Sequence, residues 1–226
     1  YIYFKKNFLI PKFVFLREIL FQGIPASIGL MMIALGSYII LYFVSIFGNN
    51  AIAGFSSAGR YEQLLFLPLL GLSTAVTSIV GQNLGAKKPE RIFETFKKAT
   101  STGFLLLLIV AIILFFTSEL AMKLFTNDKE VIFFGSIYLK IWSFGFPAFP
   151  LFFISNATFQ GLKKPIIVMY MAILRFVLIP IIVVTLIHNN IKIDYIYTFI
   201  GLVIVHWIIG ILYFFYSIYK IKKLIY

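Results

Sequence analysis

The stretch "LPLLGLSTAVTSIVGQNLGAKKPERIFETFKKA", Leu67–Ala99, sets an uncharged apolar run directly against a polar segment and a group of basic residues. Glycines permit tight turns and close helix approach, and proline is favoured in the first turn of a new helix. Lysines anchor a chain at the membrane boundary. The pattern predicts a membrane helix ending near Val80, a rigid elbow over Gly81–Glu90, and a short amphipathic helix that begins at Pro89.

The composition supports a membrane environment for the whole chain. Of the 226 residues, 61% are hydrophobic and only 12% are charged. A soluble domain of this size cannot cover so much apolar surface with so few charges, so the solvent must be lipid. The chain has no cysteine, which excludes disulfides and thiolate metal sites. The apolar runs do not alternate with period two, so we expect an all-helical polytopic membrane protein rather than a barrel.

Six apolar stretches are long enough to approach or exceed the roughly 20 residues that a membrane helix needs. Polar and glycine-containing connections separate them, and no signal peptide is expected. We therefore predict one six-helix transmembrane bundle over residues 16–226. The predicted spans are about 19–47, 55–80, 102–118, 131–160, 166–187 and 195–219.

The formal net charge of +12 is unevenly distributed along the chain. Lysines and arginines gather before the first predicted span and after the second, fourth and sixth, whereas the other connections carry few cations and several acids. The positive-inside rule then places the elbow and both termini in the cytoplasm. This explains the basic charge without a nucleic-acid partner.

Four charged residues fall inside predicted spans, namely Arg60, Glu62, Lys140 and Arg175. An ionised side chain inside a membrane is expensive unless it has a partner or faces water, so each is a candidate functional residue. Arg60 cannot share a helix face with Glu62, because residues two positions apart on a helix do not face each other. We expect Glu62 to pair with Lys140 or Arg175 on another helix.

Polar side chains form two further candidate groups. Ser73 and Thr77 fall near the same stripe as Glu62, with Gln63 beside it, and this stripe either lines a transport path or makes helix–helix hydrogen bonds. Asn156 and Gln160 at i, i+4 form a second polar pair, which either clamps two helices together or lines a transport path. Trp142 and His206 have no metal or acid–base companions at useful spacing and are interpreted as packing residues. No metal or other cofactor is predicted.

The tract "GRYEQLLFLPLLGLSTA", followed by "VGQNLGAKKPER", a later "NATFQGLKKP" at Asn156 and an arginine at position 175, resembles in order the signature of the multidrug and toxic compound extrusion (MATE) family. The resemblance covers nearly the whole chain. Full members of that family have twelve spans in two six-helix lobes. The resemblance implies that this chain is the second lobe, preceded over residues 1–15 by the tail of a cytoplasmic inter-lobe linker. It also implies the N-terminal lobe as a partner and small molecules as substrates.

The resemblance also implies a secondary antiporter in the cell membrane that exports organic, often cationic, compounds by alternating access. One branch of the family carries coupling acids in the second lobe, and Ile33 and Phe149 stand at those positions here. We therefore expect the site for the coupling H⁺ or Na⁺ to lie in the first lobe.

Two other functions remain open on sequence grounds. A lipid-linked precursor flippase belongs to the same wider superfamily and would use Arg60, Lys140 and Arg175 to meet a pyrophosphate. An integral-membrane enzyme or assembly factor would need His, Asp or Glu clustered at a membrane face, and the two histidines of this chain are far apart in sequence.

Overall fold

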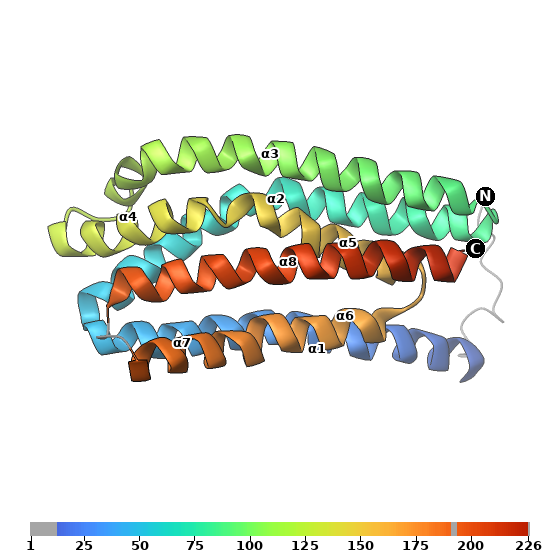
Figure 1. Ribbon diagram of the computed structural model, residues 1–226, viewed down its shortest axis with the longest axis horizontal. Coiled ribbons are helices and arrows are strands. Elements are labelled where there is room, and N and C mark those ends of the chain that lie inside the picture. Colours follow the sequence, from blue (N-terminus) through green and yellow to red (C-terminus); the bar gives the residue numbers. More distant parts are fainter. Residues whose placement is uncertain (1–12, 191–193, 226) are drawn as a thin grey trace, which may run out of the picture.

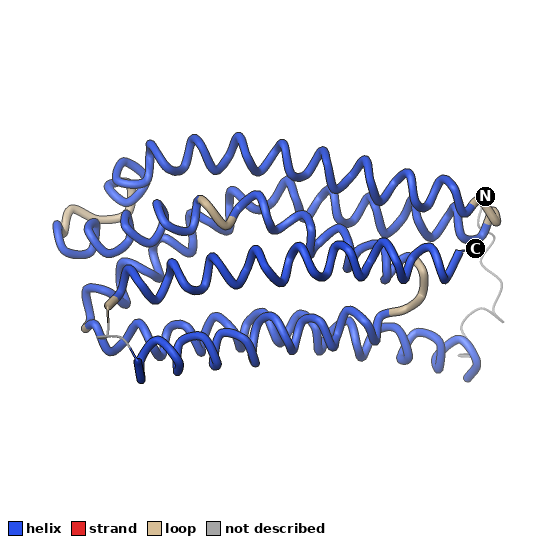
Figure 2. Tube along the Cα trace, viewed as in Figure 1, coloured by secondary structure: helices blue, strands red, loops and turns tan. Residues whose placement is uncertain are grey.

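The computed structural model describes residues 13–190 and 194–225, and these are almost entirely helical (Figure 1, Figure 2). Most of the predicted linker tail, residues 1–12, lies outside the described residues, as do residues 191–193 and 226. The helical elements are α1 Phe13–Val44, η2 Ser45–Phe47, α2 Asn49–Gly85, α3 Pro89–Lys123, α4 Lys129–Ser143, η3 Phe146–Ala148, α5 Phe149–Gly161, α6 Pro165–Ile173, η4 Leu174–Leu178, α7 Ile179–Asn190 and α8 Tyr195–Ile225.

Six membrane spans are confirmed. Five helices of the described chain are long and apolar enough to cross a bilayer, and the α4 and α5 segments form a sixth span that bends by 44°. The bend falls where Pro147 and Pro150 remove backbone donors, which breaks the helix into α4, η3 and α5. One expectation is wrong: Pro89 does not open a separate amphipathic helix, because α3 continues without interruption from Pro89 to Lys123.

The elbow between α2 and α3 is built differently from the prediction. Gly81 and Gly85 are both helical, and the left-handed backbone conformation falls on Lys87, with φ of 55°. The Lys88 N–H donates to the Asn83 carbonyl at 2.9 Å, which closes a Schellman-type helix end. The same cap recurs after α5, where Lys163 has φ of 57°.

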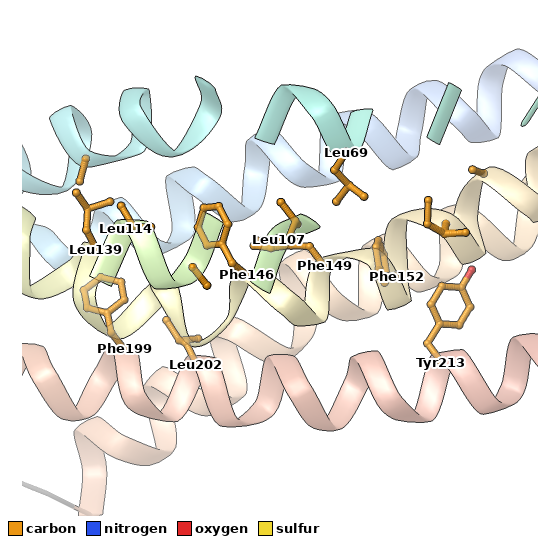
Figure 3. Close-up of a cluster of buried hydrophobic side chains, with 14 of the residues drawn as sticks. Leu69, Leu107, Leu114, Leu139, Phe146, Phe149, Phe152, Phe199, Leu202 and Tyr213 are labelled. Atoms are coloured by element: carbon orange, nitrogen blue, oxygen red, sulfur yellow. The ribbon is translucent and has the colours of Figure 1, made fainter. Parts of the chain in front are cut away.

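The helices lie roughly parallel along the long axis of the molecule (Figure 1). On one side, α1 packs against the span formed by α6, η4 and α7, while α2, α3, α4 and α5 pack together on the other side. The last helix, α8, contacts α4, α5 and α7 and so joins the two sides. Figure 3 shows the buried apolar side chains that fill the space between these helices, including Phe146, Phe149 and Phe152 near the bend.

Helices α2 and α4 cross very closely at Gly54. A Cβ atom built on Gly54 of α2 would lie 2.8 Å from the backbone nitrogen of Gly135 and 2.8 Å from the carbonyl oxygen of Val131. Only glycine allows the two backbones to approach so closely. This crossing fixes the distance between α2 and α4 about two turns before Glu62.

Candidate functional site

Glu62 occupies the interface between α2 and α4 and is held by two aromatic side chains. The Tyr138 hydroxyl donates to Glu62 Oε2 at 2.6 Å, and the Trp142 Nε1–H donates to Glu62 Oε1 at 2.7 Å. Among the described residues no basic side chain forms an ion pair with Glu62. The expected pairing with Lys140 or Arg175 is therefore wrong, and neutral donors stabilise the carboxylate instead.

The local sequence of α4 explains why both donors reach Glu62. Tyr138 and Trp142 are four residues apart, so they lie on the same face of the helix, and their rings stack at 6.0 Å with an interplanar angle of 16°. The helix ends one residue later at Ser143. The break leaves the Phe144 carbonyl free to accept a hydrogen bond of 2.7 Å from Trp207 Nε1 of α8.

Arg175 lies on the π-helical turn η4 and is only 4% exposed. Its Nη2 atom lies 2.7 and 2.9 Å from the two ring nitrogens of His206 on α8. The guanidinium carbon is 4.0 Å from the centroid of the Phe152 ring, a favourable cation–π geometry. The Nη1 atom is buried with no hydrogen-bond partner in the described part of the chain.

The two charged groups are connected through aromatic rings. His206 lies 5.5 Å from Trp142 and 4.6 Å from Phe149, measured between ring centroids. Hydrogen bonds and ring contacts thus link Glu62, Tyr138, Trp142, His206 and Arg175 inside the bundle, and we call this group the central cluster. It draws on α2, α4, η4 and α8 and lies beside the bend of the fourth span.

The other candidate residues lie outside the central cluster. Arg60, Gln63 and Lys140 are exposed on the surface of the bundle. Arg60 and Gln63 belong to α2, and Lys140 belongs to the last turn of α4.

The polar stripe on α2 continues below Glu62 as a helix–helix contact. The Thr77 hydroxyl donates to the Ala157 carbonyl of α5 at 3.2 Å, which favours the structural interpretation at this residue. The Ser73 hydroxyl oxygen is buried and has no hydrogen-bond partner among the described residues, so it makes no such contact. Asn156 is a clamp, because its Oδ1 accepts a hydrogen bond of 2.8 Å from the Tyr213 hydroxyl of α8; Gln160 is half-buried one turn further along α5.

The sequence interpretation missed three members of the central cluster. Tyr138 was not singled out, and the view of Trp142 and His206 as simple packing residues is wrong, since both make polar contacts to charged groups. The i, i+4 spacing of two hydrogen-bonding aromatics in a span was the available signal. Phe149 packs its ring on His206, with 4.6 Å between the ring centroids.

The described residues contain no group of three or more His, Cys, Asp or Glu side chains arranged to hold a metal ion. The central cluster offers ionic and hydrogen-bonding chemistry, because it contains one carboxylate at a helix interface and one buried guanidinium, separated by aromatic rings.

The chain matches known transporters in sequence and in fold. The family model described as MatE matches residues 25–186. The chain is 25% identical over 166 residues to "Probable multidrug resistance protein YpnP" of Bacillus subtilis (strain 168), covering 74% of this chain and 37% of that protein. It is 28% identical over 137 residues to "Probable multidrug resistance protein NorM" of Thermotoga maritima, covering 61% of this chain and 30% of that protein.

The comparison with solved structures finds the same fold and shows how much of a transporter the chain covers. The fold superposes on a solved outward-facing multidrug resistance MATE family transporter with a TM-score of 0.91 at 22% identity, covering 97% of this chain and 49% of that structure. The matched region spans about a third of the length of the curated relatives and the chain about half of the solved transporter. Because the family model covers most of its length, this six-helix chain belongs to the MATE family of transporters, whose members are not enzymes.

Proposed function

We propose that this chain is the second, C-terminal lobe of a twelve-helix exporter that moves organic, often cationic, compounds out of the cell by alternating access. The match to half of a solved MATE transporter supports a partner lobe, and the names of the relatives support multidrug export. The basic residues at one end of the bundle support a cell-membrane orientation with that end in the cytoplasm. The substrate cavity would lie between the two lobes.

The main support for ion-coupled transport is the environment of the Glu62 side chain. Its charge is not neutralised by any described basic side chain, and it is half-buried at the interface between two spans. A carboxylate in such low-dielectric surroundings attracts a cation strongly. We therefore assign Glu62 as a carboxylate that binds the coupling H⁺ or Na⁺ in this lobe, in addition to any acid in the first lobe.

Cation binding at Glu62 has a direct mechanical consequence. The anionic carboxylate accepts hydrogen bonds from Tyr138 and Trp142, which tie α2 to the part of α4 just before the bend. Charge-assisted hydrogen bonds are roughly twice as strong as neutral ones, so a bound cation weakens this tie. Coupling requires that the affinity for the cation differ between two conformations of the protein.

The test is the substitution Glu62→Gln in the full-length transporter, expressed in a drug-sensitive bacterial strain. The amide keeps the shape of the side chain but removes the charge. We expect the minimal inhibitory concentration of an organic cation such as ethidium to fall to that of cells without the transporter, with membrane expression unchanged. Glu94→Gln is the matched control, because Glu94 is exposed at the end of the bundle and paired with Lys98. Full resistance in the Glu62 variant would remove this residue from the mechanism.

The flippase alternative is less well supported by the geometry. It needs basic side chains gathered around a common cavity to meet a pyrophosphate. Arg60 and Lys140 are exposed on different helices, and Arg175 is buried against His206 and Phe152.

A further inference from the structure

Two lysines from different helices converge on one aromatic ring at the basic end of the bundle. Lys97 of α3 has its Nζ atom 5.0 Å from the centroid of the Phe93 ring. Lys222 of α8 approaches the same ring, with its Nζ atom at 5.3 Å. The two ammonium groups are thus separated by no more than the sum of these distances, a range in which like charges repel.

No described carboxylate relieves that repulsion. Neither Lys97 nor Lys222 forms an ion pair within the described chain. The acid closest in sequence on the same helix, Glu94, is engaged by Lys98 at 2.7 Å. Attraction to the face of Phe93 offsets part of the repulsion, but the local charge remains positive and would be stabilised by an anion between the two helices.

The surroundings of this pair are apolar on the membrane side. Behind Phe93, Phe96 of α3 stacks on Phe214 of α8 at 5.5 Å, and deeper in the bundle Phe104 contacts Trp207 at 6.4 Å. On α8, Phe215 lies two turns before Lys222 on the same face and is 62% exposed. A charged pair at the end of the helices is therefore continuous with an exposed apolar surface that faces acyl chains.

The pair also lies in the most basic region of the molecule. The elbow between α2 and α3, the connection between α5 and α6, and the C-terminal end of α8 all lie at the same end of the bundle, on the right in Figure 1. The exposed cations at this end include Arg17, Lys87, Lys88, Arg91, Lys97, Lys98, Lys163, Lys164, Lys222 and Lys223.

We propose that Lys97, Lys222 and Phe93 form a binding site for the phosphodiester headgroup of an anionic phospholipid, with its acyl chains lying along α3 and α8. The phosphate lies between the two ammonium groups, and Phe93 holds the lysine stems in place. A lipid fits better than free phosphate, because the apolar surface that continues from the site favours attached hydrocarbon. The proposal needs only a membrane-embedded lobe and does not rest on export activity.

The experiment is native mass spectrometry of the full-length transporter in detergent, titrated with phosphatidylglycerol or with phosphatidylcholine carrying the same acyl chains. The double variant Lys97→Gln, Lys222→Gln is expected to weaken binding of the first phosphatidylglycerol by about tenfold or more, with phosphatidylcholine binding unchanged. Phe93→Leu keeps an apolar side chain without an aromatic face and is expected to weaken the same step by a few-fold.

The matched control is Lys163→Gln, Lys164→Gln, which removes the same charge from the same end of the bundle and should leave the first binding step within about twofold. An equal loss in both double variants would show a diffuse charge effect and overturn the site. Competition by millimolar inorganic phosphate would show a free-anion site and overturn the lipid assignment. Equal affinity of the native protein for the two lipids would also overturn it.

Discussion

At the scale of single residues, the central cluster separates a carboxylate from a guanidinium and gives each of them neutral partners. Glu62 accepts two hydrogen bonds from aromatic donors, and Arg175 contacts an imidazole and a phenyl ring. Neither charge is cancelled by the other. Charged groups inside a membrane destabilise the fold. Their presence favours a role in the transport cycle for Glu62 and a structural role for Arg175, which depends on His206 as its partner.

The pairing of Arg175 with His206 can be tested by a double-mutant cycle. His206→Leu leaves the buried guanidinium without its hydrogen-bonding partner, so we expect it to lower the free energy of unfolding by about 2–3 kcal/mol. Adding Arg175→Met to that variant removes the stranded charge and should recover most of the loss. The measurement is thermal or denaturant unfolding of the purified protein in detergent, with non-additivity as the expected result. Simple addition of the two single effects would show that the pair contributes no coupling.

At the scale of elements, the site depends on how closely α2 and α4 cross. The hydrogen bonds of Tyr138 and Trp142 to Glu62 are possible because Gly54 and Gly135 bring the two helix backbones together. The bend after Ser143 then ends α4 just beyond Trp142, so the two donors lie in the last rigid turns before the break.

Gly54→Ala tests this crossing. The new Cβ would meet backbone atoms of α4 at 2.8 Å, and backbone cannot move aside cheaply, so we expect destabilisation by about 1–3 kcal/mol together with reduced resistance. Gly59→Ala is the control on the same helix, since a Cβ there meets no atom within 4 Å. It should be neutral or stabilise by up to about 1 kcal/mol through helix propensity. Thermal unfolding compares the two, and equal behaviour would exclude a packing role for Gly54.

At the scale of the whole molecule, basic residues are concentrated at one end of the bundle. The two Lys-Lys-Pro connections and the end of α8 lie at one end of the bundle (Figure 1). The turn between α3 and α4 lies at the other end and carries Asp128 and Glu130 beside Lys129. The positive-inside rule favours the first end in the cytoplasm.

Site-directed labelling checks this orientation. The chain has no cysteine, so a thiol reagent can react in it only with a cysteine introduced at Ala86 or at Asn127. In intact cells an impermeant thiol reagent is expected to label Asn127→Cys and to leave Ala86→Cys unmodified until the membrane is opened. Labelling of both from outside would contradict the number of spans between them, and the reverse pattern would invert the orientation.

The sequence by itself determined the six spans, the position of the elbow and the family. These follow from hydropathy over about 20 residues and from local turn signals, which depend little on what a helix packs against. The family signature around "GQNLGAKKPER" is likewise a local feature, and the family match bears it out. The length of α3 was underestimated, because its polar first turns continue as helix beyond the apolar window.

Only the tertiary structure decided the partners of the charged residues. The spacing on one helix shows which residues share a face, but it does not show which neighbouring helix lies opposite that face. Glu62 was expected to meet a cation and instead meets Tyr138 and Trp142, because the close crossing at Gly54 brings α4 against it. Arg175 meets His206 because α8 passes between the two sides of the bundle, a contact between residues 31 positions apart that no local pattern encodes.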